Sequence, residues 1–169
     1  MQRYRLLAAY NAWANGLIYD AASGLAPEAL ETDHGAAFGS LIRTLNHVLV
    51  ADRIWMRRLT GRGETYDRLD LVLHPNLADL RAAREAEDAR IAAFVHALSP
   101  ERLDGPFEYA NMAGLRFRQP LWSALDHVFN HQTHHRGQAH VLLGRSGAQP
   151  PALDLIYFQR EAGFIAPLG

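Results

Sequence analysis

Apolar side chains recur at intervals of three and four residues along four long stretches of the chain, which is the spacing of one helical face. Glycine or proline follows soon after each stretch, and Asn76 precedes the third as a typical helix N-cap. The pattern therefore predicts four long helices, over residues 2–25, 37–59, 77–99 and 121–143.

The predicted helices differ in how their polar residues are distributed. Residues 37–59 are apolar almost all the way round, so we expect this helix to be largely buried. Residues 77–99 carry many charges beside a narrow apolar stripe. We therefore expect the polar face of that helix to meet water.

Two smaller elements complete the prediction. Alternating apolar residues around the sequence Asn111-Met-Ala-Gly predict a short hairpin within residues 106–120, and residues 152–161 predict a short last helix after two prolines. No repeat, low-complexity tract or linker divides the 169 residues, a length that suits one domain. We expect an all-α fold, a single domain over residues 1–169 built as a four-helix bundle. The pattern leaves the order of the helices in space open.

Charge and composition exclude several classes of function. The 17 basic and 18 acidic side chains leave a formal net charge of -1, so we expect no nucleic-acid partner. All basic side chains are arginines, and without lysine there is no Schiff-base chemistry. Without cysteine there is no disulfide, thiolate metal site or cysteine nucleophile, so thiol chemistry would need a thiol brought by a substrate.

The chain start and the hydropathy pattern bear on location. The first residues lack the apolar core of a signal peptide, and no apolar run of about 18 residues occurs anywhere. We therefore expect a cytoplasmic protein that makes no membrane contact.

Histidine is the residue type that departs most from average usage. The chain has nine histidines, and His127, His131, His134 and His135 fall on one stripe of the last long helix, between its apolar and polar arcs. His131 and His135 lie on the core-facing side of the stripe and are one helical turn apart. That spacing lets two imidazoles reach one metal ion.

A metal site needs a third protein ligand, and His47 is the best candidate. It lies in the middle of the nearly all-apolar second helix, where an imidazole without a partner is costly. The alternative for His47 is a core histidine bonded to a neighbouring side chain, and taken alone that alternative is equally good. Four clustered histidines on the last helix favour the metal.

The other histidines are weaker candidates. His74 and His96 are expected to be exposed, and His140 lies away from the cluster on the helical wheel. The Glu-x-x-His spacing of di-iron bundles occurs once, at Glu31 to His34, although that site needs it twice. The zinc-protease motif His-Glu-x-x-His does not occur.

The run from His127 to Gln138, His-Val-Phe-Asn-His-Gln-Thr-His-His-Arg-Gly-Gln, resembles the signature of the DinB-like superfamily of bacterial metal-binding four-helix bundles. The resemblance extends to residues 10–15, 45–55 and 153–158, and so covers essentially the whole chain. It implies a divalent metal ion, zinc or nickel, bound by the residues that match the ligands of the family, His47, His131 and His135. It also implies a homodimer.

The resemblance defines the site better than the reaction. Characterised relatives include thiol-dependent transferases and isomerases that use low-molecular-weight thiols. Many other members are expected to be hydrolases, but their activity is unknown. We expect a metal-dependent hydrolase or a thiol S-transferase acting on a small molecule, since three neutral imidazoles leave the ion its full charge and an open position. The alternatives are a non-catalytic bundle with a structural metal site, and an interaction module with incidental histidines.

Several further residues have two readings. Gln138 and His134 are candidates for the surroundings of the metal ligands. Asn11, Trp13 and Trp55 would either line a cavity or pack between helices. Arg136 is expected to form a structural ion pair or a helix cap rather than to clamp a substrate.

Overall fold

Four long helices form a bundle in this computed structural model, which describes residues 1–166. They are α1 (Gln2–Ser23), α3 (Leu41–Thr60), α4 (Leu77–His96) and α6 (Leu121–Arg145). The predicted all-α four-helix bundle is confirmed. The domain predicted over residues 1–169 includes residues 167–169, which lie outside the described part. Within residues 1–166, no helix is both long and apolar enough to cross a membrane.

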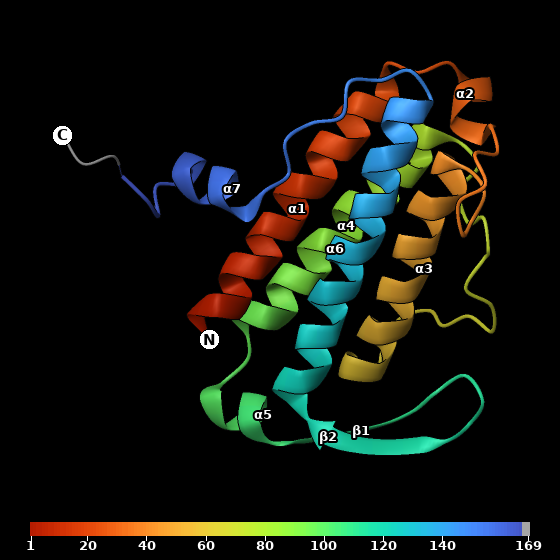
Figure 1. Ribbon diagram of the computed structural model, residues 1–169. Coiled ribbons are helices and arrows are strands. Elements are labelled where there is room, and N and C mark those ends of the chain that lie inside the picture. The colour runs from red at the N-terminus through yellow and green to blue at the C-terminus, as the bar shows by residue number, and fades with distance from the viewer. Residues whose placement is uncertain (167–169) are drawn as a thin grey trace.

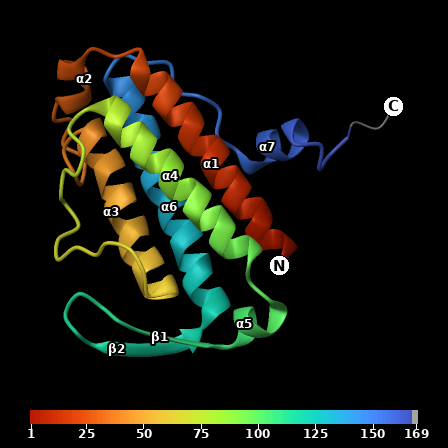
Figure 2. The ribbon, with the colours of Figure 1, turned by 180° about the vertical axis from the view of Figure 1, so that it is seen from behind.

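The order of the helices in space is not their order in the sequence. Helix α1 packs against α4 and α6, and α3 packs against the same two helices, so α1 and α3 are diagonal. Figures 1 and 2 show α1 and α6 running in one direction and α3 and α4 in the other. Because α3 and α4 are parallel, the connection over residues 61–76 has to run back along the bundle.

The helix ends differ from the prediction at defined places. Helix α3 begins at Leu41 rather than four residues earlier, because Gly39 has a φ of 77° and Ser40 accepts a hydrogen bond from the Arg43 backbone as its N-cap. The last helix, α7 (Leu155–Glu161), begins three residues later than predicted. The residues before it are held against α1, where the Tyr10 hydroxyl donates to a backbone carbonyl of that segment at 2.7 Å.

Three short elements lie at the ends of the bundle. The predicted hairpin is present as β1 (Pro106–Ala110) and β2 (Arg116–Pro120), an antiparallel pair. Two short helices, α2 (Pro27–Glu31) and α5 (Pro100–Asp104), were not predicted. Each begins with a proline, because proline suits the first turn of a helix. The sequence analysis used the same prolines only as the ends of the preceding helices.

Buried apolar residues form two main clusters, one toward each end of the bundle. One contains Ile18, Leu49 and Leu142, and the other contains Met56, Ile91 and Leu125. In every long helix, buried polar residues occupy the positions between the two clusters. These residues are Asn11, Asn15, Asp52, Arg84, Asp88, Gln132 and Arg136.

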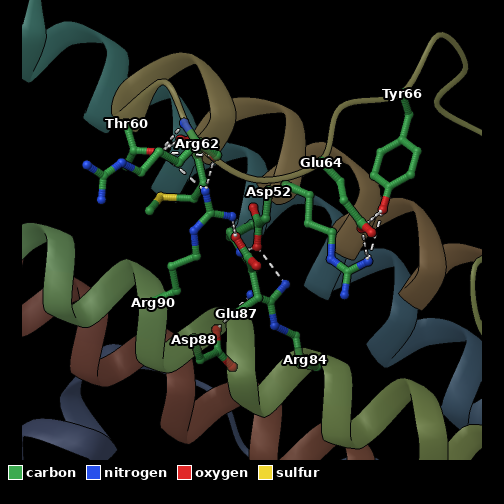
Figure 3. A network of polar contacts seen from close by, with 12 residues as sticks. Asp52, Thr60, Arg62, Glu64, Tyr66, Arg84, Glu87, Asp88 and Arg90 are labelled. Atoms are coloured by element: carbon green, nitrogen blue, oxygen red, sulfur yellow. Dashed lines mark hydrogen bonds and ion pairs between the residues drawn. The ribbon is translucent and has the colours of Figure 1, made fainter.

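The centre of this polar layer is an ion-pair cluster between α3 and α4. The Arg84 guanidinium donates to Asp52 at 2.6 Å and lies 3.0 Å from an oxygen of Asp88 (Figure 3). Gln132 of α6 also donates to Asp52. Burial raises the pKa of Asp52 above its ordinary value, against the pull of Arg84. The expectation that the charged face of residues 77–99 meets water is therefore wrong for Arg84 and Asp88, which are buried.

Amide side chains connect this cluster to Arg136. The amide nitrogens of Asn11 and Asn15 donate to Asp88 at 3.0 and 3.1 Å, and their oxygens accept from Arg136 Nη1 at 2.5 and 3.1 Å. Gln132 joins Arg136 to Asp52 in the same way. Two aspartates and two arginines are thus linked across all four long helices, and their charges balance. Arg136 is a structural residue here, bonded through amides instead of a direct ion pair.

Candidate metal centre

The three predicted ligands come together between α3 and α6. Each of His47, His131 and His135 offers a ligand atom, and these atoms all lie within 4.8 Å of one another. His47 and His135 are buried, and His131 is partly exposed. This convergence agrees with the sequence analysis, which placed His131 and His135 on the core-facing side of the last long helix. Their role as metal ligands stays a prediction.

Hydrogen bonds define which ring nitrogens carry protons. His47 Nδ1 lies 2.8 Å from the Leu69 carbonyl oxygen, and His135 Nδ1 lies 2.8 Å from Gln138 Oε1. Both oxygens can only accept, so both Nδ1 atoms must donate. In a neutral ring this leaves Nε2 with its lone pair, which is the form that binds metal.

The rings of His47, His131 and His135 are all neutral at pH 7. Burial lowers the pKa of His47 to about 4 and the pKa of His131 to about 3, and it also lowers the pKa of His135. Yet His47 Nε2 and His135 Nε2 lie only 3.2 Å apart. With both Nδ1 positions protonated, two lone pairs face each other without a proton between them, and that contact is repulsive until a cation joins it.

The spacing fits a metal ion. Zinc binds imidazole nitrogen at about 2.0–2.1 Å, so two nitrogens of a tetrahedral site lie about 3.3 Å apart. The 3.2 Å separation of His47 Nε2 and His135 Nε2 agrees with this value. Imidazole also suits nickel and other divalent ions, so the ligand set fits a divalent ion without selecting one.

One side of the centre is closed and the other is more open. The Phe38 ring stacks on His47, with 3.8 Å between ring centroids, and presents its edge to His135 at 5.7 Å. On the other side, His131 is partly exposed and His127 is exposed, with the His127 ring 4.9 Å from that of Trp55. The side of His127 and His131 is therefore the more accessible side of the centre.

The two residues expected around the ligands form a chain with His135. Gln138 accepts from His135 Nδ1 and donates through Nε2 to His134 Nε2, 3.2 Å away. His134 itself is exposed. Gln138 therefore orients His135 through its other ring nitrogen, as expected of a group that supports a ligand.

Other sequence candidates lie elsewhere or differ in exposure. Trp13 donates to Glu161 at 3.0 Å and packs near α7, and Asn11 belongs to the central polar layer, so neither lies at the centre. His96 is exposed as expected. His74 was expected to be exposed but is half-buried, because its backbone N–H is held by Asn46 Oδ1 at 2.9 Å.

Two parts of the centre were missed by the sequence analysis. The Leu69 carbonyl belongs to the connection over residues 61–76, and a main-chain oxygen leaves no mark in the residue types. Phe38 was assigned to the start of a helix, whereas it precedes α3 and folds over His47. Only the direction of the loops could have indicated either contact.

Comparison with known proteins agrees with this architecture. The family model described as DinB family matches residues 1–166. The chain is 27% identical over 147 residues to Protein DinB of Bacillus subtilis strain 168, covering 82% of this chain and 83% of that protein.

Two solved structures share the fold. A DinB-like protein from Bacillus cereus ATCC 10987 aligns with a TM-score of 0.69 at 19% identity, covering 85% of this chain and 91% of that one. A DinB-like protein from Bacillus subtilis aligns with a TM-score of 0.62 at 14% identity, covering 88% and 97%. With a family model that spans nearly all of its length, the chain belongs to the DinB family.

Proposed function

We propose that the protein binds one divalent metal ion, zinc or nickel, through His47 Nε2, His135 Nε2 and a ring nitrogen of His131. The observation that carries the proposal is the 3.2 Å approach of two Nε2 atoms whose rings both donate through Nδ1. A divalent cation turns this repulsive contact into two bonds.

The proposed activity is that of a metal-dependent hydrolase or thiol S-transferase acting on a small molecule. Three protein ligands leave a coordination position for water or substrate. A bound divalent ion supplies Lewis acidity, which polarises a carbonyl or favours deprotonation of a water or a thiol. A thiol substrate would supply the nucleophile that a chain without cysteine lacks.

The chain contributes orientation, exclusion of water and a base. Leu69 and Gln138 hold the tautomers of two ligands, and Phe38 covers the His47 ring on the closed side. On the open side, His127 lies beside His131, with 5.9 Å between ring centroids. Burial and the nearby Arg58 lower the pKa of His127, so its ring is neutral at pH 7 and able to accept a proton from a substrate.

Metal analysis tests the binding proposal. Protein purified without an affinity tag should contain about one zinc or nickel ion per chain, by mass spectrometry of the metal. His131→Ala should lose the ion, and the exposed His96→Ala should keep it. A chain that takes up no divalent ion, or a His131→Ala variant that keeps it, would contradict the proposal.

Activity assays test the catalytic part. The metal-loaded chain should turn over at least one compound in a panel of esters, amides and electrophiles paired with low-molecular-weight thiols. His127→Gln should then lower turnover while metal content stays at one ion per chain. No turnover by the metal-loaded protein on any member would leave metal binding without catalysis.

The alternative is a structural ion, and the burial of two ligands favours it. His47 and His135 are only 3% and 9% exposed, and an ion there would join α3 to α6. X-ray absorption at the metal edge separates the two roles. A fourth ligand that exchanges with added thiol indicates catalysis, and a saturated shell of protein ligands indicates structure.

We also propose a homodimer, in which α7 contributes apolar contacts. This helix extends away from the bundle in Figure 1, and its Ile156 and Tyr157 side chains are exposed. Sedimentation equilibrium should give twice the chain mass, and charged substitutions at both positions should give the chain mass.

A further inference from the structure

A strip of aromatic side chains leads from the candidate metal centre toward the hairpin. The His127 ring lies 5.9 Å from the His131 ring and 4.9 Å from the Trp55 ring, measured between centroids. The Trp55 ring in turn lies 5.2 Å from that of Tyr109 in β1. Figure 1 shows the hairpin passing below the C-terminal end of α3 and the N-terminal end of α6. The more accessible side of the centre therefore continues as an aromatic strip that ends at β1.

Arg58 lies at the far end of this aromatic strip. Its guanidinium carbon lies over the Trp55 ring, 4.7 Å from the centroid, and over the Tyr109 ring at 5.3 Å. His47 precedes Arg58 by three turns of α3, about 16 Å along the helix axis. Because helical side chains slope toward the N-terminus of their helix, the guanidinium lies on the side of Arg58 that faces the metal centre.

Arg58 is a half-buried cation without an anionic partner. Within residues 1–166, its nitrogen atoms form no hydrogen bond or ion pair, and none of them is fully buried, so its N–H groups reach the solvent. Burial lowers the pKa of Arg58, and of the described residues only Tyr109 opposes this shift, so no carboxylate acts on the guanidinium. The rings supply cation–π contacts, but the hydrogen-bonding capacity of the guanidinium is unused.

Other arginines of the chain show how unusual this is. The more exposed Arg68 and Arg81 both pair with carboxylates of the chain. Arg58 has given up part of its hydration without such a partner, and a desolvated charge that is left unpaired costs free energy. Its surroundings therefore indicate an anion from outside the chain.

The hairpin has a carboxylate next to Tyr109, but it is not available to Arg58. Glu108 follows the alternation of β1 onto the face opposite to Tyr109. There it contacts Arg116 at 3.1 Å and Arg118 at 3.8 Å. The hairpin thus satisfies its own charges on one face and presents only aromatic rings to Arg58 on the other.

We propose that Arg58 binds a carboxylate of the substrate, at the end remote from the group that the metal ion holds. This inference rests on the proposed function, because it takes the reacting group to lie at the candidate metal centre. A guanidinium holds a carboxylate through two parallel hydrogen bonds. One unpaired cation matches one negative charge, which favours a monocarboxylate over a phosphate dianion. The substrate is therefore an elongated monocarboxylate whose body packs along Trp55 and His127.

Thiols with and without a terminal carboxylate test this on the zinc-loaded full chain. Mercaptohexanoate and mercaptooctanoate are each compared by calorimetry with the mercaptoalcohol of equal length. The thiol binds the ion in every case, so the difference within a pair reports the carboxylate alone. At one length or both, the acid should bind at least about tenfold more tightly than the alcohol. Equal affinities at both lengths would overturn the proposal.

Variants locate the carboxylate. Arg58→Gln should remove the preference for the acid and leave the affinity for the alcohol unchanged. Arg57→Gln makes the same charge change at the exposed neighbouring position and should keep the preference. Arg58→Lys keeps the charge without the planar fork and should reduce the preference only in part. A folded Arg58→Gln variant that still prefers the acid as wild type does would overturn the proposal.

A titration of the metal-free chain separates this proposal from metal binding. Phenylpropionate, with phenylpropionamide as the neutral control, is followed by the indole N–H NMR signals of the isotope-labelled protein. The acid should shift the Trp55 signal saturably, with the amide at least about tenfold weaker, while Trp13 and Trp122 outside the aromatic strip stay unchanged.

A chain that takes up no divalent ion would contradict the proposed function, and this titration would then decide on Arg58 alone. In that case, a Trp55 shift by the acid supports the carboxylate site. The absence of a saturable shift at tens of millimolar, or an equal shift by the amide, would overturn it.

Discussion

Two clusters of buried polar side chains meet at α6, and they are completed in different ways. In the central polar layer, Asp52 and Asp88 contact Arg84 directly and are linked to Arg136 through amide side chains, so two acidic and two basic groups are matched within the protein. Between α3 and α6, neutral imidazoles converge with two lone pairs 3.2 Å apart. The first cluster stabilises the fold by itself. The second indicates a place for a cation from outside.

The largest expected effect comes from breaking the self-contained cluster. Arg84→Met leaves two buried carboxylates without their partner and should lower the free energy of unfolding by about 3–5 kcal/mol. Urea denaturation measures this loss. Arg81→Met is the matched control, because its pairs with Asp20 and Glu85 lie at the surface and contribute about 0–1 kcal/mol. Equal losses for the two variants would contradict the comparison.

A ligand variant should act only through the ion. His131→Ala should lower stability by about 2.7 kcal/mol when wild-type protein is held at a free metal concentration about 100 times its dissociation constant. With a chelator present, the difference from wild type should be small. Thermal unfolding with and without chelator measures this difference. A loss of stability that is equally large with and without chelator would mean that His131 supports the fold directly. His96→Ala should behave as wild type throughout.

A smaller effect is expected from the group behind a ligand. Gln138→Met removes the acceptor of His135 Nδ1 at similar size, so metal affinity should fall about 10–100-fold while the fold is kept. Competition with a coloured chelator measures the affinity. Gln149→Met, at an exposed position beyond the helix, should not change it. An unchanged metal affinity in Gln138→Met would mean that Gln138 does not support His135 as a metal ligand.

The smallest effect is a pH dependence of the metal-free protein. Unfolded histidines take up protons near pH 6.5, whereas burial holds the pKa of His47 at about 4 and of His131 at about 3 in the fold. Their contribution is therefore complete above pH 6.5 and is lost as pH falls toward those values. Between pH 7 and pH 5.5, the free energy of unfolding of His131→Gln should fall by about 1 kcal/mol less than that of wild type, as measured by urea denaturation. An identical fall in the two proteins would mean that the His131 ring is exposed to water in the folded state.

Much of the fold follows from the sequence because apolar periodicity reports which face of a helix is buried. The same reasoning found His47, a polar residue among apolar neighbours. Asp52 lies in the same apolar helix and carried an equal signal that was not used. Arg84 and Asp88, one turn apart, were assigned to solvent because charge alone does not distinguish a wet face from a paired one.

The limits of the prediction lie in the loops. Helix order depends on the path of residues 61–76, which has no periodicity to interpret. The contact of Leu69 with His47 and the stacking of Phe38 both depend on such paths. Helical patterns therefore identified the three candidate ligands, whereas the groups that orient and cover them depend on loop paths that the patterns do not define.

The distance along the chain between the ligands also has a consequence for folding. His47 and His135 are 88 positions apart, and the second lies on the last long helix. Contacts of such long range form late, because the chain between them must be ordered first. During synthesis, α1, α3 and α4 emerge before α6 exists. An ion bound by the proposed ligands would therefore enter only after α6 has formed, and metal loading would report a late stage of folding.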